Sequence, residues 1–87
     1  MSHKELTPTG QLIAQAIMNA LEVQGINSKV EKTYLDFGQN MTWDTIIVDS
    51  KNGSYQALNP RQQNQMNEGT FDYSEINEIV NTAKRLA

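Results

Sequence analysis

The dipeptide Asn52-Gly53 lies between two apolar runs, and it restricts the fold more than any other short feature of this sequence. Asparagine tolerates positive φ and glycine adopts it freely, and the two-residue turns of β-hairpins require it. The sequence therefore predicts two antiparallel strands, over residues 41–50 and 54–58, joined by a tight turn on Asn52-Gly53. This hairpin is the centre of the expected sheet.

The position of the turn also determines which residues share a face of that sheet, because side chains alternate along a strand. The predicted pairs are Ser50 with Tyr55, Asp49 with Gln56, Val48 with Ala57 and Ile47 with Leu58. One face then carries Ile46, Val48, Tyr55 and Ala57, and the other carries Trp43, Thr45, Ile47 and Leu58. Both faces are partly apolar, so both need a cover.

A third strand is expected over residues 28–37, where β-branched and aromatic side chains are frequent. The alternation slips between Tyr34 and Leu35, which allows a bulge there, and Gly38-Gln39-Asn40 ends the strand.

Helix starts are recognised from capping residues followed by proline. Thr7-Pro8 predicts the start of a first helix, which stops at Gly25 with Ile26 in apolar contact beyond it. Asn59-Pro60, with Gln62 completing a capping box, predicts a short helix to about Met66. A last helix should begin at Asp72, with Glu75 as its capping-box partner and Phe71 stapled against Ile76.

These elements predict the fold class α+β. We expect a two-layer α/β sandwich with a three-stranded antiparallel meander and helices packed mainly on one face, in the order helix, three strands, short helix, helix. The 87 residues leave room for one domain, over residues 7–87, preceded by a disordered tail at residues 1–6.

The charge balance argues against a nucleic-acid partner. Ten acidic and seven basic residues give a net charge of −3, whereas nucleic-acid binders carry a basic surface. No apolar run is long enough for a membrane span, so we expect no membrane contact. The absence of cysteine excludes disulfides and thiol chemistry. Without a signal sequence, cytoplasmic location is the expectation.

Catalytic groups are difficult to assemble from this chain. Its one histidine, His3, falls in the expected tail, so no general base is predicted from it. Asp44 and Asp49 lie at odd spacing on one strand and point to opposite faces. Glu75 and Glu78 lack the surrounding oxygen ligands of a cation loop. We therefore expect no enzyme activity, no metal and no cofactor.

The segment 59–67 is unusually rich in amides, with six Asn or Gln residues in nine positions. Amide side chains can bind adenine edges or peptide backbones. A solvated connector is the simpler interpretation.

Surplus apolar surface is the feature that bears most on function. The apolar stripe on the first helix is wider than the surface that packing against a single neighbouring element can bury. The second face of the predicted sheet is also partly apolar. Cover from within the chain, by the short helix and the N-terminal tail, is one explanation of this surplus. The function that we predict is a small protein-interaction module, a homodimer that binds another protein through an apolar sheet or helix face. Its expected interface residues are Trp43, Ile47, Leu58 and Met18. The alternative is a nucleic-acid-associated accessory protein that uses a local basic edge of Lys29, Lys32, Lys51 and Arg61.

Overall fold

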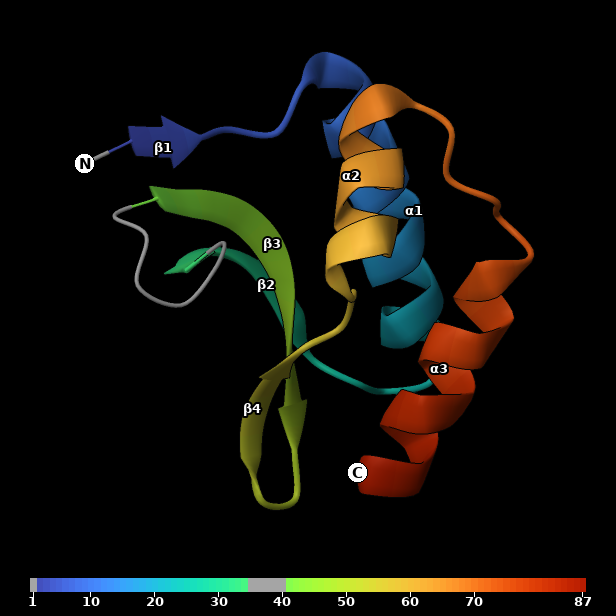
Figure 1. Ribbon diagram of the computed structural model, residues 1–87. Coiled ribbons are helices and arrows are strands. Elements are labelled where there is room, and N and C mark those ends of the chain that lie inside the picture. Colours follow the sequence, from blue (N-terminus) through green and yellow to red (C-terminus); the bar gives the residue numbers. More distant parts are fainter. Residues whose placement is uncertain (1, 35–40) are drawn as a thin grey trace.

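The computed structural model describes residues 2–34 and 41–87, and it is an α+β fold of three helices and a four-stranded mixed sheet (Figure 1). In chain order the elements are β1 (Ser2–Lys4), α1 (Pro8–Val23), β2 (Ser28–Tyr34), β3 (Met41–Ser50), β4 (Gly53–Gln56), α2 (Pro60–Glu68) and α3 (Glu75–Leu86). The predicted fold class is confirmed. The predicted bulge after Tyr34 and the break at residues 38–40 lie outside the described residues.

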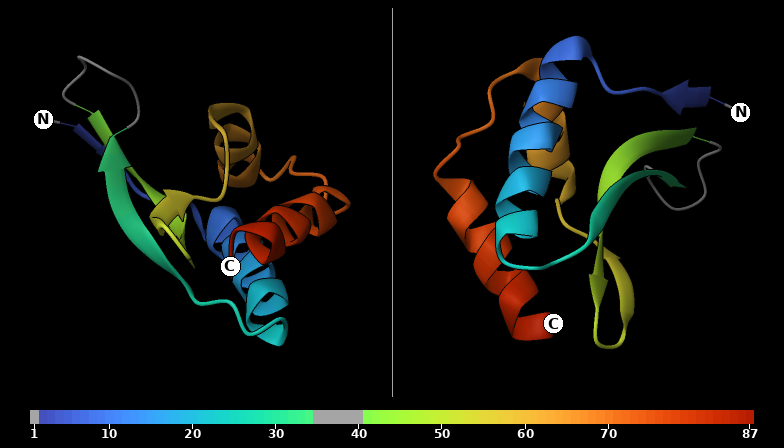
Figure 2. Two further views of the ribbon diagram at one scale, coloured as in Figure 1. Left: turned by 90° about the horizontal axis from the view of Figure 1, so that it is seen from below. Right: turned by 180° about the vertical axis from the view of Figure 1, so that it is seen from behind.

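β3 is the centre of the sheet. β2 pairs with one of its edges in antiparallel register, from Ser28 opposite Val48 to Tyr34 opposite Thr42. Its other edge is shared by two short strands, β1 in parallel and β4 in antiparallel pairing. Strands β2, β3 and β4 do follow one another as an antiparallel meander, but the parallel β1 makes the sheet mixed. The three helices are grouped together beside the sheet (Figure 2).

Residues 2–6 differ from the disordered tail that we expected over residues 1–6. Ser2–Lys4 form β1, with His3 opposite Thr42 on β3. Leu6 is buried in the hydrophobic core. A three-residue strand carries too little periodicity to be recognised, and its partner lies far away in the sequence.

The hairpin forms, but its turn lies one residue earlier than predicted. Ser50 pairs with Gly53 and Val48 with Tyr55, which puts Lys51 and Asn52 in the turn. Gly53 has a positive φ of 120°. Among the described residues only glycines have positive φ, so Asn52 does not adopt the conformation that a turn on Asn52-Gly53 would require. The Ser50 hydroxyl donates to the Gly53 carbonyl and accepts from the Asn52 amide, which stabilises the turn in this position. The pairs shift by two residues, so Tyr55 stays on the face of Val48. Leu58, predicted opposite Ile47, lies beyond the end of β4 and belongs to the core cluster of Ile46 and Val48.

The predicted starts of the first two helices are confirmed. The Thr7 side chain accepts a hydrogen bond from the Gly10 amide at 2.9 Å, and Gly25 ends α1 with a φ of 74°. Asn59 and Gln62 form the reciprocal capping box of α2. Local hydrogen bonds of this kind need only neighbouring residues, so short sequence motifs predict them well.

The start of the third helix is only partly as predicted. α3 begins at Glu75, and the Asp72 carboxylate accepts from the Ser74 amide at 2.9 Å instead of capping the helix itself. This hydrogen bond lowers the pKa of Asp72 below its ordinary value. Glu75 does not reach back to Asp72, because its carboxylate accepts from Arg61 and Gln62 of α2.

The core lies between α1 and the sheet. α1 contributes Ile13, Ala14, Ile17 and Leu21, and it also contacts α2 and α3. Ile46 and Val48 of β3 belong to the same cluster, with Tyr55 and Ala57 packed against it. This confirms the predicted helix-facing side of the hairpin. The second and third helices absorb part of the surplus apolar surface of α1, although Leu12 and Val23 stay exposed.

Candidate functional site

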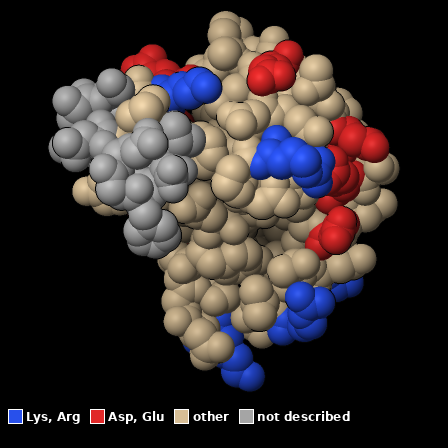
Figure 3. Space-filling view, viewed as in Figure 1, with Lys and Arg blue, Asp and Glu red and all other residues tan. Residues whose placement is uncertain are grey.

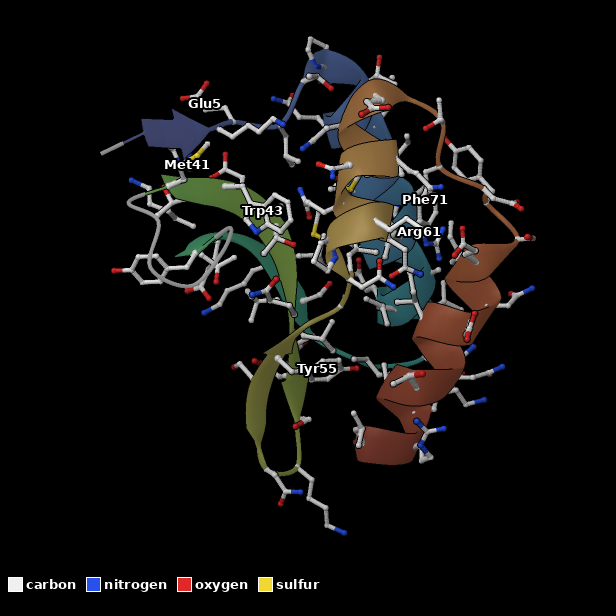
Figure 4. The ribbon with its side chains drawn as sticks, viewed as in Figure 1. Glu5, Met41, Trp43, Tyr55, Arg61 and Phe71 are labelled. Atoms are coloured by element: carbon white, nitrogen blue, oxygen red, sulfur yellow. The ribbon has the colours of Figure 1, made fainter. Side chains whose placement is uncertain are left out.

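Three of the four residues predicted as an interface lie in the interior, and the fourth, Met18, is half-buried. Trp43 is only 1% exposed, and Ile47 and Leu58 are also buried. Leu58 belongs to the same core cluster as Ile46, and Met18 packs against that cluster. In Figure 4 the Trp43 side chain lies on the side of β3 that faces α2. The surplus apolar side chains of the second sheet face are therefore part of the protein core. The four predicted interface residues do not form an exposed docking surface.

Two glutamines help to cover this second face. Gln56 of β4 donates to the Thr33 hydroxyl of β2 at 3.2 Å and so reaches across β3. Gln63 of α2 accepts from the Thr45 hydroxyl at 2.7 Å. Thr33 and Thr45 both lie on the Trp43 face of the sheet. The two glutamine side chains therefore cover part of a face that we expected a second chain to cover.

Gln63 also closes the gap between β1 and β4. Its side-chain amide donates to the Asp44 carbonyl at 2.8 Å, where neither short strand pairs with β3. Gln63 is fully buried. One side chain thus replaces a strand's backbone amide at this edge. The amide-rich segment 59–67 is not the solvated connector that we favoured, since Gln62, Gln63 and Asn67 are buried.

The four basic residues of the alternative site do not form one stripe. Lys29 pairs with Glu31 at 3.4 Å, and Arg61 pairs with Glu75 at 3.1 Å. Lys29 and Lys32 are three residues apart on β2, so their side chains point to opposite faces. Lys51 lies in the hairpin turn. The predicted basic edge is thus divided among separate elements and partly neutralised.

A different basic group lies at the end of the molecule where α3 finishes. The Lys51 amide donates to the Leu86 carbonyl at 2.9 Å, which joins the hairpin turn to the last turn of α3, where Lys84 and Arg85 lie. Basic side chains gather at this lower end, whereas the acidic side chains on the same view lie higher (Figure 3). These cations suit the negative end of the helix dipole, so their placement has a structural explanation.

His3, Thr42 and Asp44 form a polar cluster across β1 and β3. His3 Nδ1 lies 2.8 Å from the Thr42 hydroxyl, and His3 Nε2 lies 2.9 Å from Asp44 Oδ1. A hydroxyl, an imidazole and a carboxylate in this order resemble the groups of a catalytic triad. Our expectation that no such set could assemble rested on a disordered tail, and it is wrong. The three side chains hold β1 against β3.

A groove of about 390 Å³ lies between β4, the start of α2 and α3. Its walls include Tyr55, Gln62, Glu78 and Leu86. Tyr55 points from β4 toward α3 (Figure 4), and its hydroxyl has no hydrogen-bond partner among the described residues. Burial raises the pKa of this hydroxyl above 10.0, and the Arg85 guanidinium partly opposes the increase.

β2 presents the longest unpaired strand edge in the described sheet, because β1 and β4, which also pair only with β3, are shorter. No other described strand pairs with its outer edge, and five of its seven residues are exposed, on both faces. Val30 is 40% exposed and Tyr34 is 66% exposed. Unpaired strand edges bind other strands readily. The sequence predicts a strand here, but its edge becomes recognisable as a site only when the order of the strands is known.

Among the described residues no three His, Asp or Glu side chains are close enough to hold a metal ion. No described helix combines the length and apolar character needed to cross a membrane. No family model, curated protein or solved structure matches this chain.

Proposed function

We propose that this protein is a small, non-enzymatic protein-interaction module that binds another protein chain along the outer edge of β2. The single observation that carries the proposal is the exposure of this strand on both faces, next to a β3 in which most residues are buried. A strand with a free edge can accept a second strand through backbone hydrogen bonds, and this mode of binding is common in protein recognition.

The backbone of β2 supports the same proposal. The Asp49 amide donates to the Asn27 carbonyl at 3.1 Å, and these two residues face each other in the extension of the β2–β3 register. Hydrogen-bonded pairs alternate along an antiparallel ladder. Odd-numbered residues of β2 therefore direct their amides and carbonyls toward β3. The even-numbered residues Ser28, Val30, Lys32 and Tyr34 direct theirs outward, where a partner strand would bind.

The other sites are weaker bases for a function. The hydroxyl and imidazole of the His3 cluster are used to hold β1, and Thr42 is buried. The basic residues predicted for nucleic-acid binding are dispersed, and two of them are paired with carboxylates. Strand addition uses groups that have no partner within the described sheet.

Photo-crosslinking in cells that express the protein tests this function. We would replace Tyr34 with the crosslinking residue benzoylphenylalanine, which keeps an aromatic side chain at the exposed end of β2. The matched control carries the same residue at Asn64, an exposed position on α2. We expect adducts with a protein chain from position 34 and not from position 64. Equal adduct formation at both positions, or none at either, would contradict binding at this edge.

A further inference from the structure

We infer that the chain bound at β2 is a second copy of this protein, in an antiparallel pairing centred on Val30. This inference rests on the proposed function and names its partner and register. In this arrangement Val30 faces Val30 of the other copy, Ser28 faces Lys32, and Lys29 faces Glu31. The two sheets join into one continuous sheet around a two-fold axis, the most common symmetry of protein oligomers.

The hydrogen-bonding pattern limits the possible registers. Outward amides and carbonyls belong to even-numbered residues of β2, so these residues must face even-numbered residues of the other copy. A two-fold axis satisfies this condition when it passes through a residue, not between two residues. In the register centred on Val30, the outward-directed residues Ser28, Val30 and Lys32 face Lys32, Val30 and Ser28 of the other copy. These three facing pairs can form about six backbone hydrogen bonds.

Charge separates the Val30 register from its neighbours. A centre on Lys29, Glu31 or Lys32 would place that charged side chain directly opposite its own copy, and like charges across a strand pair are destabilising. The Val30 centre instead places two apolar side chains together. It also sets Lys29 opposite Glu31 twice, once on each side of the axis.

The charged pairs are already ordered within each chain. Lys29 Nζ and Glu31 Oε1 lie 3.4 Å apart along the same face of β2. In the dimer, each Lys29 would lie beside Glu31 of its own chain and opposite Glu31 of the other copy. The four charged side chains would thus form a group in which every charge is next to two opposite charges. On the other face, Val30 would bury the apolar surface that it exposes in the single chain. The strand is thus complementary to itself in this register.

Analytical ultracentrifugation of charge variants tests the inference. The wild-type chain should be a dimer at high micromolar concentration. In the proposed register, Lys29→Glu places a glutamate opposite each Glu31 of the other copy. Glu31→Lys places a lysine opposite each Lys29. Each variant alone should therefore show a dimer dissociation constant raised at least about ten-fold. Lys84→Glu makes the same charge change on α3, and it should leave the dimer intact.

Recombination supplies the decisive measurement. An equimolar mixture of Lys29→Glu and Glu31→Lys restores both opposite-charge pairs, so the two variants should form a heterodimer. The double variant Lys29→Glu/Glu31→Lys should form a homodimer. One single variant loses two charge units and the other gains two, so the mixed pair has the same total charge as the wild-type dimer. Recombination also shows that both variants are folded.

Three results would overturn the inference: a monomeric wild-type chain, single variants that dimerise as tightly as the wild type, or single variants that remain monomers when mixed. These results are separable from a failure of the proposed function. If position 34 crosslinks to a different protein while the purified chain is a monomer, β2 still binds a partner and only the choice of a second copy is wrong.

Discussion

β2 and β3 are neighbours in one sheet and pair along the whole length of β2, yet their environments are opposite. β3 has a neighbour on each edge and is buried on both faces, including Trp43 and Thr45 on one face and Ile46 and Val48 on the other. β2 has one neighbour, and most of its residues are exposed. In a sheet this small, the position of a strand decides its exposure more than its own composition does.

The comparison also shows how a small protein can leave an edge open. The edge of β3 away from β2 is closed by two short strands and by the Gln63 amide between them. The edge of β2 has no such closure among the described residues. Its alternating Lys29, Glu31 and Lys32 carry charge instead, and charged side chains at an edge prevent indiscriminate pairing. A charged edge still admits a partner with complementary charges.

Removing the largest buried side chain of β3 should have the largest effect. We expect Trp43→Ala to lower the free energy of unfolding by about 3 to 5 kcal/mol, because it leaves a large cavity under the α2 side of the sheet. Tyr34→Ala, an aromatic truncation at the exposed end of β2, should change it by less than about 0.5 kcal/mol. Urea denaturation of both variants checks the contrast. Similar losses would mean that the two strands are not in different environments.

The closure of the β3 edge predicts an intermediate effect. Gln63→Met keeps the side-chain volume but removes the amide, which leaves the Asp44 carbonyl without its buried donor. We expect a loss of about 1 to 3 kcal/mol. Gln56→Met is the matched control, since the Gln56 amide makes its hydrogen bond to Thr33 at the exposed surface. A Gln63 variant as stable as the Gln56 variant would show that this edge needs no closure.

The contact between α2 and α3 predicts the smallest effect, and it depends on pH. Hydrogen bonds from Gln62 and Arg61 lower the pKa of Glu75 below its ordinary value of 4.5. A lowered carboxyl pKa contributes stability above the ordinary value, and this contribution is lost as the pH falls through the folded-state pKa. The wild type should therefore lose stability more steeply below pH 4.5 than Glu75→Gln does. Parallel urea midpoints across that pH range would contradict this role for Glu75.

Local signals predicted the helices and the hairpin because their stabilising contacts are close in sequence. Thr7, Asn59 and Gln62 cap their helices with hydrogen bonds over three residues. The side-chain alternation of β3 correctly divided its residues between two faces. The turn at Asn52-Gly53 moved by one residue because the Ser50 hydroxyl supplies hydrogen bonds that turn propensities do not include.

Features that depend on distant partners could not be predicted in this way. β1 exists because His3 and its neighbours meet β3, and three residues carry no strand period of their own. Gln63 looks like any solvated amide until the edge that it closes is known. The same applies to the interface residues. An apolar Trp43 face can be covered from inside or outside, and only the packing of α2 and β4 decides between them.

The parallel pairing of β1 with β3 has a consequence for the order of events during synthesis. His3 lies 39 positions before Thr42, so a ribosome that adds roughly 5 to 20 residues per second makes β1 about 2 to 8 s before its partner. Helices form within about a microsecond, so α1 can form during this interval. β1 must therefore wait, attached to a helix that has already begun to fold, until β3 emerges and gives it a place in the sheet.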